Sequence, residues 1–368
     1  MKFVVIKTKV GLLEKFAELQ RTDNIFETDR DKLQLSSWFG KECHFKLLYK
    51  ISRDGGSPQT FHNLCDNKGP TVTIFYNTDN NVYGGYLSDS WRNGPAEPWR
   101  EPPVWKSKTL DSLKEFIRSF QPKEELNVPE VNILLVGQVG AGKSSVVNTI
   151  NSVWKGEISS RSWAGSSEHS LTTSFTKFRI SDPSTGTYLK FRLCDMRGLE
   201  ETMDVKSEDI AFLLDGNLPN KYKFNPAARA TKDTPGFIKE PTMKDMIHTV
   251  VFVIDGSNVE VMPDGIIKKL KDIKEMLIER DVPLLVLVTK IDKVCSDVDK
   301  DVEEVFFSNA VKKTVDKVSD IIAIPRSHVL PVKNYEKERT LQNNICILAM
   351  EALKQALLFC QDFLENQS

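Results

Sequence analysis

The stretch that decides the fold is VNILLVGQVGAGKSS, residues 131–145. Five of its first six residues are apolar, which is typical of a strand buried on both faces. The spacing G-x-x-x-x-G-K-S begins next, and the helical pattern SSVVNTI comes directly after the lysine. Strand, glycine loop and helix in this order predict a phosphate-binding loop, where backbone N–H groups and a helix N-terminus face phosphate oxygens.

The chemistry of such a loop gives its residues separate roles. Lys143 is expected to reach the β- and γ-phosphates of a nucleotide, and the Ser144 hydroxyl to coordinate Mg²⁺. The other residues expected to surround the nucleotide here are Gly137, Gln138, Val139, Gly140, Ala141, Gly142 and Ser145.

A second phosphate-sensing motif follows the predicted strand 187–194, where the sequence reads Asp195-Met196-Arg197-Gly198. The Asp195 carboxylate is expected to hold Mg²⁺ through water, and the Gly198 N–H to meet the γ-phosphate. Leu199 comes next, where many small GTPases carry the glutamine that orients the attacking water. Leucine cannot do this work, so a catalytic residue stays unassigned and at most slow GTP hydrolysis is expected.

The polar segment 155–176 has the place of a switch that closes over the γ-phosphate. Thr172 and Thr173 are both candidates for its metal-binding threonine, and Thr173 is preferred because more loop then precedes the next strand. The alternative is that neither binds metal. The predicted Mg²⁺ ligands are therefore Ser144, Thr173 and Asp195.

Base recognition is predicted after the strand 284–288, where Thr289-Lys290-Ile291-Asp292 matches T/N-K-x-D. A carboxylate at Asp292 accepts hydrogen bonds from guanine N1–H and N2–H₂, and adenine does not offer that pair. The Lys290 stem is expected to lie along the base. Lys333, after the predicted strand 328–332, stands where GTPases place a loop that touches the base edge. Guanine nucleotides (GTP or GDP) with Mg²⁺ are the predicted ligands.

Composition limits the alternatives. The 368 residues carry a net charge of -1, which favours neither nucleic acid nor an anionic membrane as a partner. Six cysteines show no C-x-x-C or zinc spacing, which indicates a reducing compartment. The apolar run in MKFVVIKTKV is too short for a signal peptide, and no run has transmembrane length. We therefore expect a cytoplasmic protein.

Further elements follow from periodicity. Helices are predicted over 10–20, 109–120, 266–279, 298–318 and 341–363, and a strand over 248–255. Residues 92–107 form a strap in which Trp99 and Trp105 are expected to anchor on a neighbouring surface, and 199–247 is an unusually long connection. Alternating strands and helices predict an α/β fold, with a mostly parallel sheet of about six strands and helices on both faces.

The N-terminal part resembles a known module. LLYKISRDGGSPQTFHNLCDNKGPTVTIFYNTDNNVYGGYLSDSW, residues 47–91, is similar to the first half of a TLDc domain, and the chain then departs into RNGPAEPWREPPVWKSK. Within it, SRDGGS is expected to form a turn, TFHNLCD a short helix starting at Thr60, and 68–87 two strands joined by a turn at 77–81. The resemblance implies a smaller, β-rich, truncated interaction module.

The chain as a whole resembles the interferon-induced protein 44 family. The residues that carry this are ILLVGQVGAGKSSVVNTINSVWKG, LCDMRGL, LDGNLPNKYKFNP and IHTVVFVIDGS. The layout is then a TLDc-like module over 1–91, a linker strap and helix over 92–127, and a P-loop GTPase-like domain over 128–368. The resemblance implies a cytoplasmic, interferon-inducible protein of the innate immune, antiviral response.

Three functions remain open on the sequence. The first is a guanine-nucleotide-binding switch, the second a GTPase stimulated by self-association, and the third a pseudo-GTPase scaffold that uses the TLDc-like module. Protein partners, including a second copy of the chain, are not identified by any motif.

Overall fold

The structure, a computed structural model, describes residues 2–9, 37, 44–66, 68–76, 82–87, 97–159, 174–201, 205–225 and 227–367. The chain divides into two compact units, Met1–Glu97 and Pro98–Ser368. The helix predicted over 10–20, the turn at 77–81 and both Thr172 and Thr173 lie outside the described residues.

The first unit contains a four-stranded antiparallel sheet in the order β2-β1-β3-β4. Its strands are β1 (Lys2–Lys9), β2 (His44–Lys50), β3 (Thr71–Tyr76) and β4 (Val82–Leu87). The two strands predicted on either side of 77–81 are β3 and β4, paired as a hairpin. The apolar run near the N-terminus forms β1, between β2 and β3, so its hydrophobicity belongs to a sheet.

Two short helices of this unit differ in detail from the prediction. SRDGGS was expected to be a turn only, but α2 (Ile51–Asp54) occupies its first half and the turn begins at Gly55, whose φ is 81°. The next helix, α3 (Pro58–Cys65), begins before Thr60 because Pro58 fits the first helical turn after Ser57. Cys65 is fully buried, and burial raises the pKa of its thiol to about 11, which suits packing rather than reactivity.

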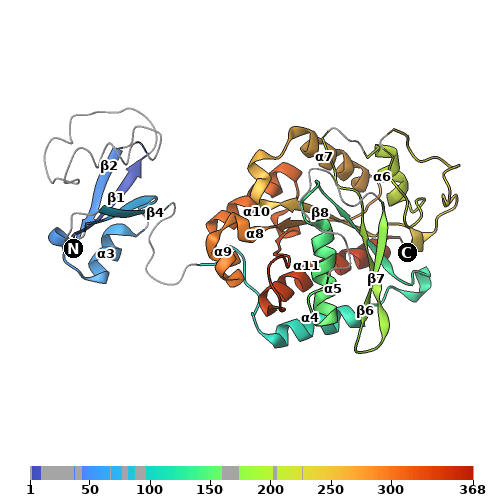
Figure 1. The fold of residues 1–368 in the computed structure, drawn as a ribbon, viewed down its shortest axis with the longest axis horizontal. Helices are drawn as coiled ribbons and strands as arrows, with labels where there is room; N and C mark the ends of the chain where they lie inside the picture. The colour runs from blue at the N-terminus through green and yellow to red at the C-terminus, as the bar shows by residue number, and fades with distance from the viewer. Residues whose placement is uncertain are drawn as a thin grey trace. The chain divides into compact units, whose positions relative to one another are not determined.

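The second unit is organised around a six-stranded sheet in the order β10-β9-β8-β5-β7-β6 (Figure 1). Neighbouring strands are parallel except β6 and β7, which form an antiparallel hairpin. The strands are β5 (Val131–Val136), β6 (Thr176–Asp182), β7 (Thr187–Asp195), β8 (Thr249–Asp255), β9 (Leu284–Thr289) and β10 (Val329–Pro331). The predicted mostly parallel sheet is confirmed.

Helices cover both faces of this sheet, as predicted (Figure 1). On one face, α5 (Lys143–Lys155) and α11 (Asn343–Asn366) pack against Ile133, Leu135 and Val251. Helices α6 (Ser207–Leu214), α7 (Asp264–Ile278) and α10 (Asn309–Ile322) lie on the other. Every residue of β5 is buried, so the strand that enters the glycine loop lies in the centre of the core.

The single helix predicted over 298–318 is wrong. The chain forms α8 (Ile291–Val294), α9 (Ser296–Lys300), the 3₁₀ segment η4 (Val302–Phe306) and then α10. Two side chains explain the interruption: Asp301 accepts a hydrogen bond from the Glu303 N–H at 3.0 Å, and Ser308 from the Val311 N–H at 3.2 Å. Such side-chain caps compete with a continuous helix.

Residues 98–105 of the strap pack where the predicted helix 298–318 is interrupted. The Trp99 N–H donates to the Phe306 carbonyl at 2.8 Å, and its indole N–H to the Val305 carbonyl at 3.0 Å. Arg100 donates to the carbonyls of Val329 and Arg326. Residues 98–105 are thereby fixed on the second unit, as the anchoring role predicted for Trp99 requires.

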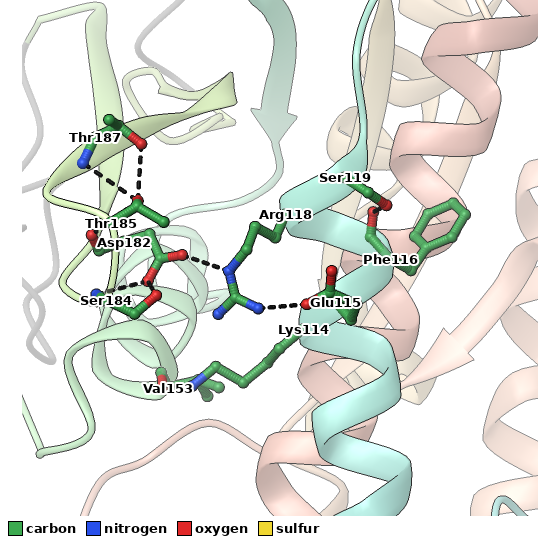
Figure 2. A network of polar contacts seen from close by, with 10 residues as sticks. All are labelled: Lys114, Glu115, Phe116, Arg118, Ser119, Val153, Asp182, Ser184, Thr185 and Thr187. Atoms are coloured by element: carbon green, nitrogen blue, oxygen red, sulfur yellow. Dashed lines mark hydrogen bonds and ion pairs between the residues drawn. The ribbon is translucent and has the colours of Figure 1, made fainter.

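Helix α4 (Ser107–Ser119), which the sequence assigns to the linker, also braces the second unit (Figure 2). Arg118 forms an ion pair at 2.6 Å with Asp182, at the turn between β6 and β7. The Lys114 ammonium donates to the Val153 carbonyl at 3.1 Å, near the C-terminal end of α5. One helix therefore ties the glycine-loop helix to the β6–β7 hairpin.

A buried histidine joins the starts of β5 and β8 and gives a pH-dependence prediction. His248 Nδ1 accepts from the Asn132 N–H at 2.8 Å, and burial lowers the pKa of the imidazole from 6.5 to about 4. Between pH 6.5 and 4 the imidazole is protonated in the unfolded chain but stays neutral in the folded chain. The free energy of unfolding therefore falls as the pH drops toward 4. The full contribution, about 3 kcal/mol, is present above pH 6.5.

In His248→Asn the amide oxygen keeps an acceptor near the Asn132 N–H without titrating. Urea unfolding at pH 7, 5.5 and 4.5 is expected to show a shallower loss of stability with acid than in the wild type. Equal slopes would contradict the assignment.

Candidate functional site

The loop between β5 and α5 has the backbone that a phosphate-binding loop needs. Gly140 and Gly142 have φ of 76° and 96°, in the left-handed region that favours glycine, and α5 starts directly after Gly142. At Gly137 a Cβ atom would lie 2.1 Å from the Val253 carbonyl oxygen of β8, so only glycine permits this close approach. The loop is therefore held against the carboxyl edge of the sheet.

Lys143 points back into this loop. The residue is 6% exposed, and its ammonium donates to the carbonyls of Gly137 at 2.9 Å and Gln138 at 3.2 Å. Burial lowers the pKa of Lys143 to about 8, although the nearby Asp195 charge acts in the opposite direction. A cation held in this way is compensated mainly by carbonyl dipoles, and phosphate oxygens would give it a stronger partner.

Ser144 and Asp195 are brought together. The Ser144 hydroxyl donates to Asp195 Oδ2 at 2.7 Å, and the carboxylate is fully buried at the end of β7. Within the described part of the chain, no group of three or more His, Cys, Asp or Glu residues is placed to hold a metal ion. Mg²⁺ typically takes one or two carboxylates and completes its octahedron with water and phosphate oxygens, so this hydroxyl–carboxylate pair fits it.

The segment after Asp195 is joined to the glycine loop. The Leu199 N–H donates to the Gly137 carbonyl at 3.0 Å, and the Val139 N–H donates to the Leu199 carbonyl at 3.1 Å. A Cβ atom on Gly198 would lie 2.8 to 2.9 Å from Val139 atoms, so this approach also needs glycine. Leu199 is 2% exposed as a residue and packs in the core.

Two polar residues that flank this position pair with each other. Arg197 and Glu200 form an ion pair at 3.1 Å with little exposed side-chain surface. Leu199 therefore has neither the chemistry nor the orientation to place a water, and its charged neighbours are engaged in a local pair.

The predicted guanine motif is fixed to the same loop. The Thr289 hydroxyl donates to the carbonyls of Ala141 at 2.6 Å and Ile254 at 3.2 Å. Lys290 has φ of 56°, and its ammonium pairs at 2.6 Å with the carboxylate of Asp255, a residue that lies outside the predicted motifs. Asp292 lies in the first turn of α8 and is half-buried. Thr289 therefore connects the predicted guanine motif to the glycine loop.

Asp255 could have been found, because it ends the apolar strand HTVVFVID just as Asp195 ends β7. Burial would raise the pKa of its carboxyl, but the hydrogen bonds from Lys290 and Ser257 outweigh burial and hold it below the usual range. The carboxylate is thus charged and keeps the Lys290 stem in place.

The predicted base-edge loop also converges on Gly142. A Cβ atom there would lie 3.3 Å from Asn334 Nδ2 and 3.6 Å from Thr289 Oγ1. Asn334 Oδ1 accepts from the Thr149 hydroxyl of α5 at 3.1 Å. Lys333 is buried and its ammonium lies 2.8 Å from Glu338, so it is directed at that carboxylate. The phosphate loop, the guanine motif and the base-edge loop meet at one edge of the sheet.

Within the described residues, no helix is long and apolar enough to span a membrane. The family model of the TLDc domain matches residues 22–127. That match continues past residue 98, where the second unit begins, and through α4.

Several curated proteins are similar over most of the chain. Interferon-induced protein 44 of Mus musculus is 31% identical over 406 residues, covering 90% of this chain and 96% of the mouse protein. Interferon-induced protein 44 of Homo sapiens is 31% identical over 256 residues, 69% of this chain and 57% of its own length. The human interferon-induced protein 44-like is 33% identical over 253 residues, with coverage of 68% and 56%.

Among solved structures, one titled as a "probable GTP-binding protein engB" aligns with a TM-score of 0.34 and 14% identity, over 64% of this chain and 100% of its own. The strand order and the loop geometry define the fold of the second unit. The mouse relative is matched along almost its whole length, and the TLDc match agrees with the N-terminal sequence pattern. The chain belongs to the interferon-induced protein 44 family.

Proposed function

We propose that the second unit binds GTP and GDP with Mg²⁺, and that the protein acts as a cytoplasmic, interferon-inducible factor of the innate immune, antiviral response. The convergence of three motifs at Gly142 carries the nucleotide part of this proposal. The names of the relatives, which call them interferon-induced, support the biological part.

Different residues would bind the phosphates, the Mg²⁺ ion and the base. Lys143 and the backbone N–H groups of 137–145 would bind the phosphates, and Gly198 would sense the γ-phosphate. Ser144 and Asp195 would hold Mg²⁺, with a threonine at 172 or 173 as a further ligand. Asp292 would read guanine, with Lys290 alongside the base. Mg²⁺ would neutralise phosphate charge at this site.

Binding, rather than fast turnover, is the activity that the site supports. The buried Leu199 and the Arg197–Glu200 pair leave the position of the attacking water without a side chain of the usual kind. We therefore propose a switch whose nucleotide state alters the binding of a protein partner, which a second copy of the chain could supply.

Calorimetric titration of the full chain in Mg²⁺ tests this function. GTP and GDP are expected to bind, and ATP to bind at least about a hundredfold more weakly, because a site with specific acceptors rejects a base that lacks the matching donors. Equal affinity for ATP and GTP would refute guanine selectivity. Binding of neither would favour the scaffold function, and rapid single-turnover hydrolysis that rises with protein concentration would favour the self-stimulated GTPase.

A further inference from the structure

A buried ion pair closes residues 333–338, a loop within the connection between β10 and α11. Lys333 Nζ lies 2.8 Å from Glu338 Oε1, and the two side chains are only 4% and 6% exposed. Burying two charges costs several kcal/mol per ion before their attraction is counted, so such a pair is weak evidence for stability alone. A pair of this kind is better attested as a device that selects one conformation.

The second oxygen of Glu338 fixes the loop backbone. Glu338 Oε2 accepts from the N–H groups of Glu336 at 3.0 Å and Lys337 at 3.2 Å. Burial would raise the pKa of this carboxyl, but Lys333 and the backbone N–H donors outweigh burial and keep it lowered. The Glu338 carboxylate therefore contacts the Lys333 side chain at the start of the loop and the backbone at its end.

Other contacts place this loop between the two halves of the candidate site. On the phosphate side, Asn334 Oδ1 accepts from the Thr149 hydroxyl of α5 at 3.1 Å, and the Tyr335 N–H donates to the same hydroxyl at 3.2 Å. On the base side, Lys337 pairs with Asp299 at 2.6 Å, and Glu336 lies 3.5 Å from the ammonium of Lys293, the residue after Asp292. The loop thus spans from the glycine-loop helix to the residues proposed to read the base.

We propose that Glu338 is a positioning residue for guanine recognition, which acts by holding Lys333 and the 333–338 loop against the Asp292 side of the site. This inference rests on the proposed guanine-nucleotide binding. Lys333 then serves as the anchor of the loop, and the surface offered to the base is the loop backbone and Asn334. The pair sets the base pocket and leaves the phosphate contacts of Lys143 unchanged.

Competition with a fluorescent GDP analogue in Mg²⁺ tests the proposal, with GDP and ADP as the probes. Glu338→Gln, Lys333→Met and the double variant are each expected to weaken GDP about tenfold, roughly the effect of losing one hydrogen bond to the base. ADP affinity should stay unchanged because it depends on the phosphate loop. The losses should not add in the double variant, since the two residues act as a unit.

Lys300→Met is the matched control, because it removes a lysine from an exposed ion pair. The side chain of Lys300 is 75% exposed, and that of its partner Asp297 is 69% exposed. It should change neither affinity. The double variant leaves no unpaired buried charge and serves where a single variant does not fold. Unchanged GDP affinity, additive losses, or equal losses for GDP and ADP would overturn the positioning role. A wild-type chain that binds neither nucleotide would instead overturn the proposed function.

Discussion

Lys143→Ala is expected to weaken GTP and GDP by about a thousandfold or more, which removes binding at micromolar concentrations. In the wild type the buried ammonium lies against the carbonyls of Gly137 and Gln138, inside the loop that would surround the phosphates. Charge-assisted hydrogen bonds contribute about 1.5–3 kcal/mol each, and two of them correspond to a factor of this size. Titration with GDP in Mg²⁺ measures the loss.

The same helix provides the control. Lys155 lies at the other end of α5 and is exposed, where its ammonium donates to the Ser159 hydroxyl at 3.0 Å. Lys155→Ala should bind GDP as the wild type does, and thermal melting without nucleotide should show that Lys143→Ala is folded. A folded Lys143→Ala chain that still binds GDP normally would contradict the assignment of the loop.

The second sheet could be predicted because its strands carry strong local signals. VNILLV, LLVLV and HTVVFVID are apolar runs of strand length, and two of the three are followed directly by a polar motif. In a parallel sheet the carboxyl ends of the strands share one edge, so motifs that end strands must lie near one another. The contact of Thr289 with Ala141 is a direct consequence of this geometry.

Contacts between distant segments could not be predicted in the same way. The interruption of 298–318 depends on the caps at Asp301 and Ser308, and the strap rests on that interruption through Trp99 and Phe306. The periodicity of residues 298–318 does not predict that the strap packs there. In the same way β1 shows only a short apolar run, and its place between β2 and β3 is decided by pairing across the unit.

In the candidate site, too, the sequence motifs could be predicted and the contacts between segments could not. Residue types predict roles for Lys143, Asp195 and Asp292, because each stands at a fixed spacing in a motif with a known mechanism. The Lys333–Glu338 pair has no such spacing, and only the folded loop reveals that the Lys333 ammonium is directed at a carboxylate. Similarly, the sequence shows that Leu199 lacks the chemistry of glutamine, while its burial appears only in the structure.

Asp292→Asn is expected to reverse the base preference, with GTP weakened about a thousandfold and xanthosine triphosphate bound more tightly than GTP. The carboxylate would accept from guanine N1–H and N2–H₂. An amide replaces one acceptor with a donor, which opposes the guanine amino group but matches the carbonyl of xanthine. Discrimination of this size is usual when a site is left with an unmatched polar group.

The surroundings of Asp292 make this a change in recognition rather than in folding. The residue is half-buried in the first turn of α8, and the preceding Thr289 and Lys290 are fixed by Ala141 and Asp255. Asp297→Asn, an exposed substitution in the neighbouring helix α9, is the matched control and should leave both nucleotides unaffected. Parallel titrations with GTP, xanthosine triphosphate and ATP decide the matter. If Asp292→Asn weakens all three equally, the carboxylate supports the site but does not read the base.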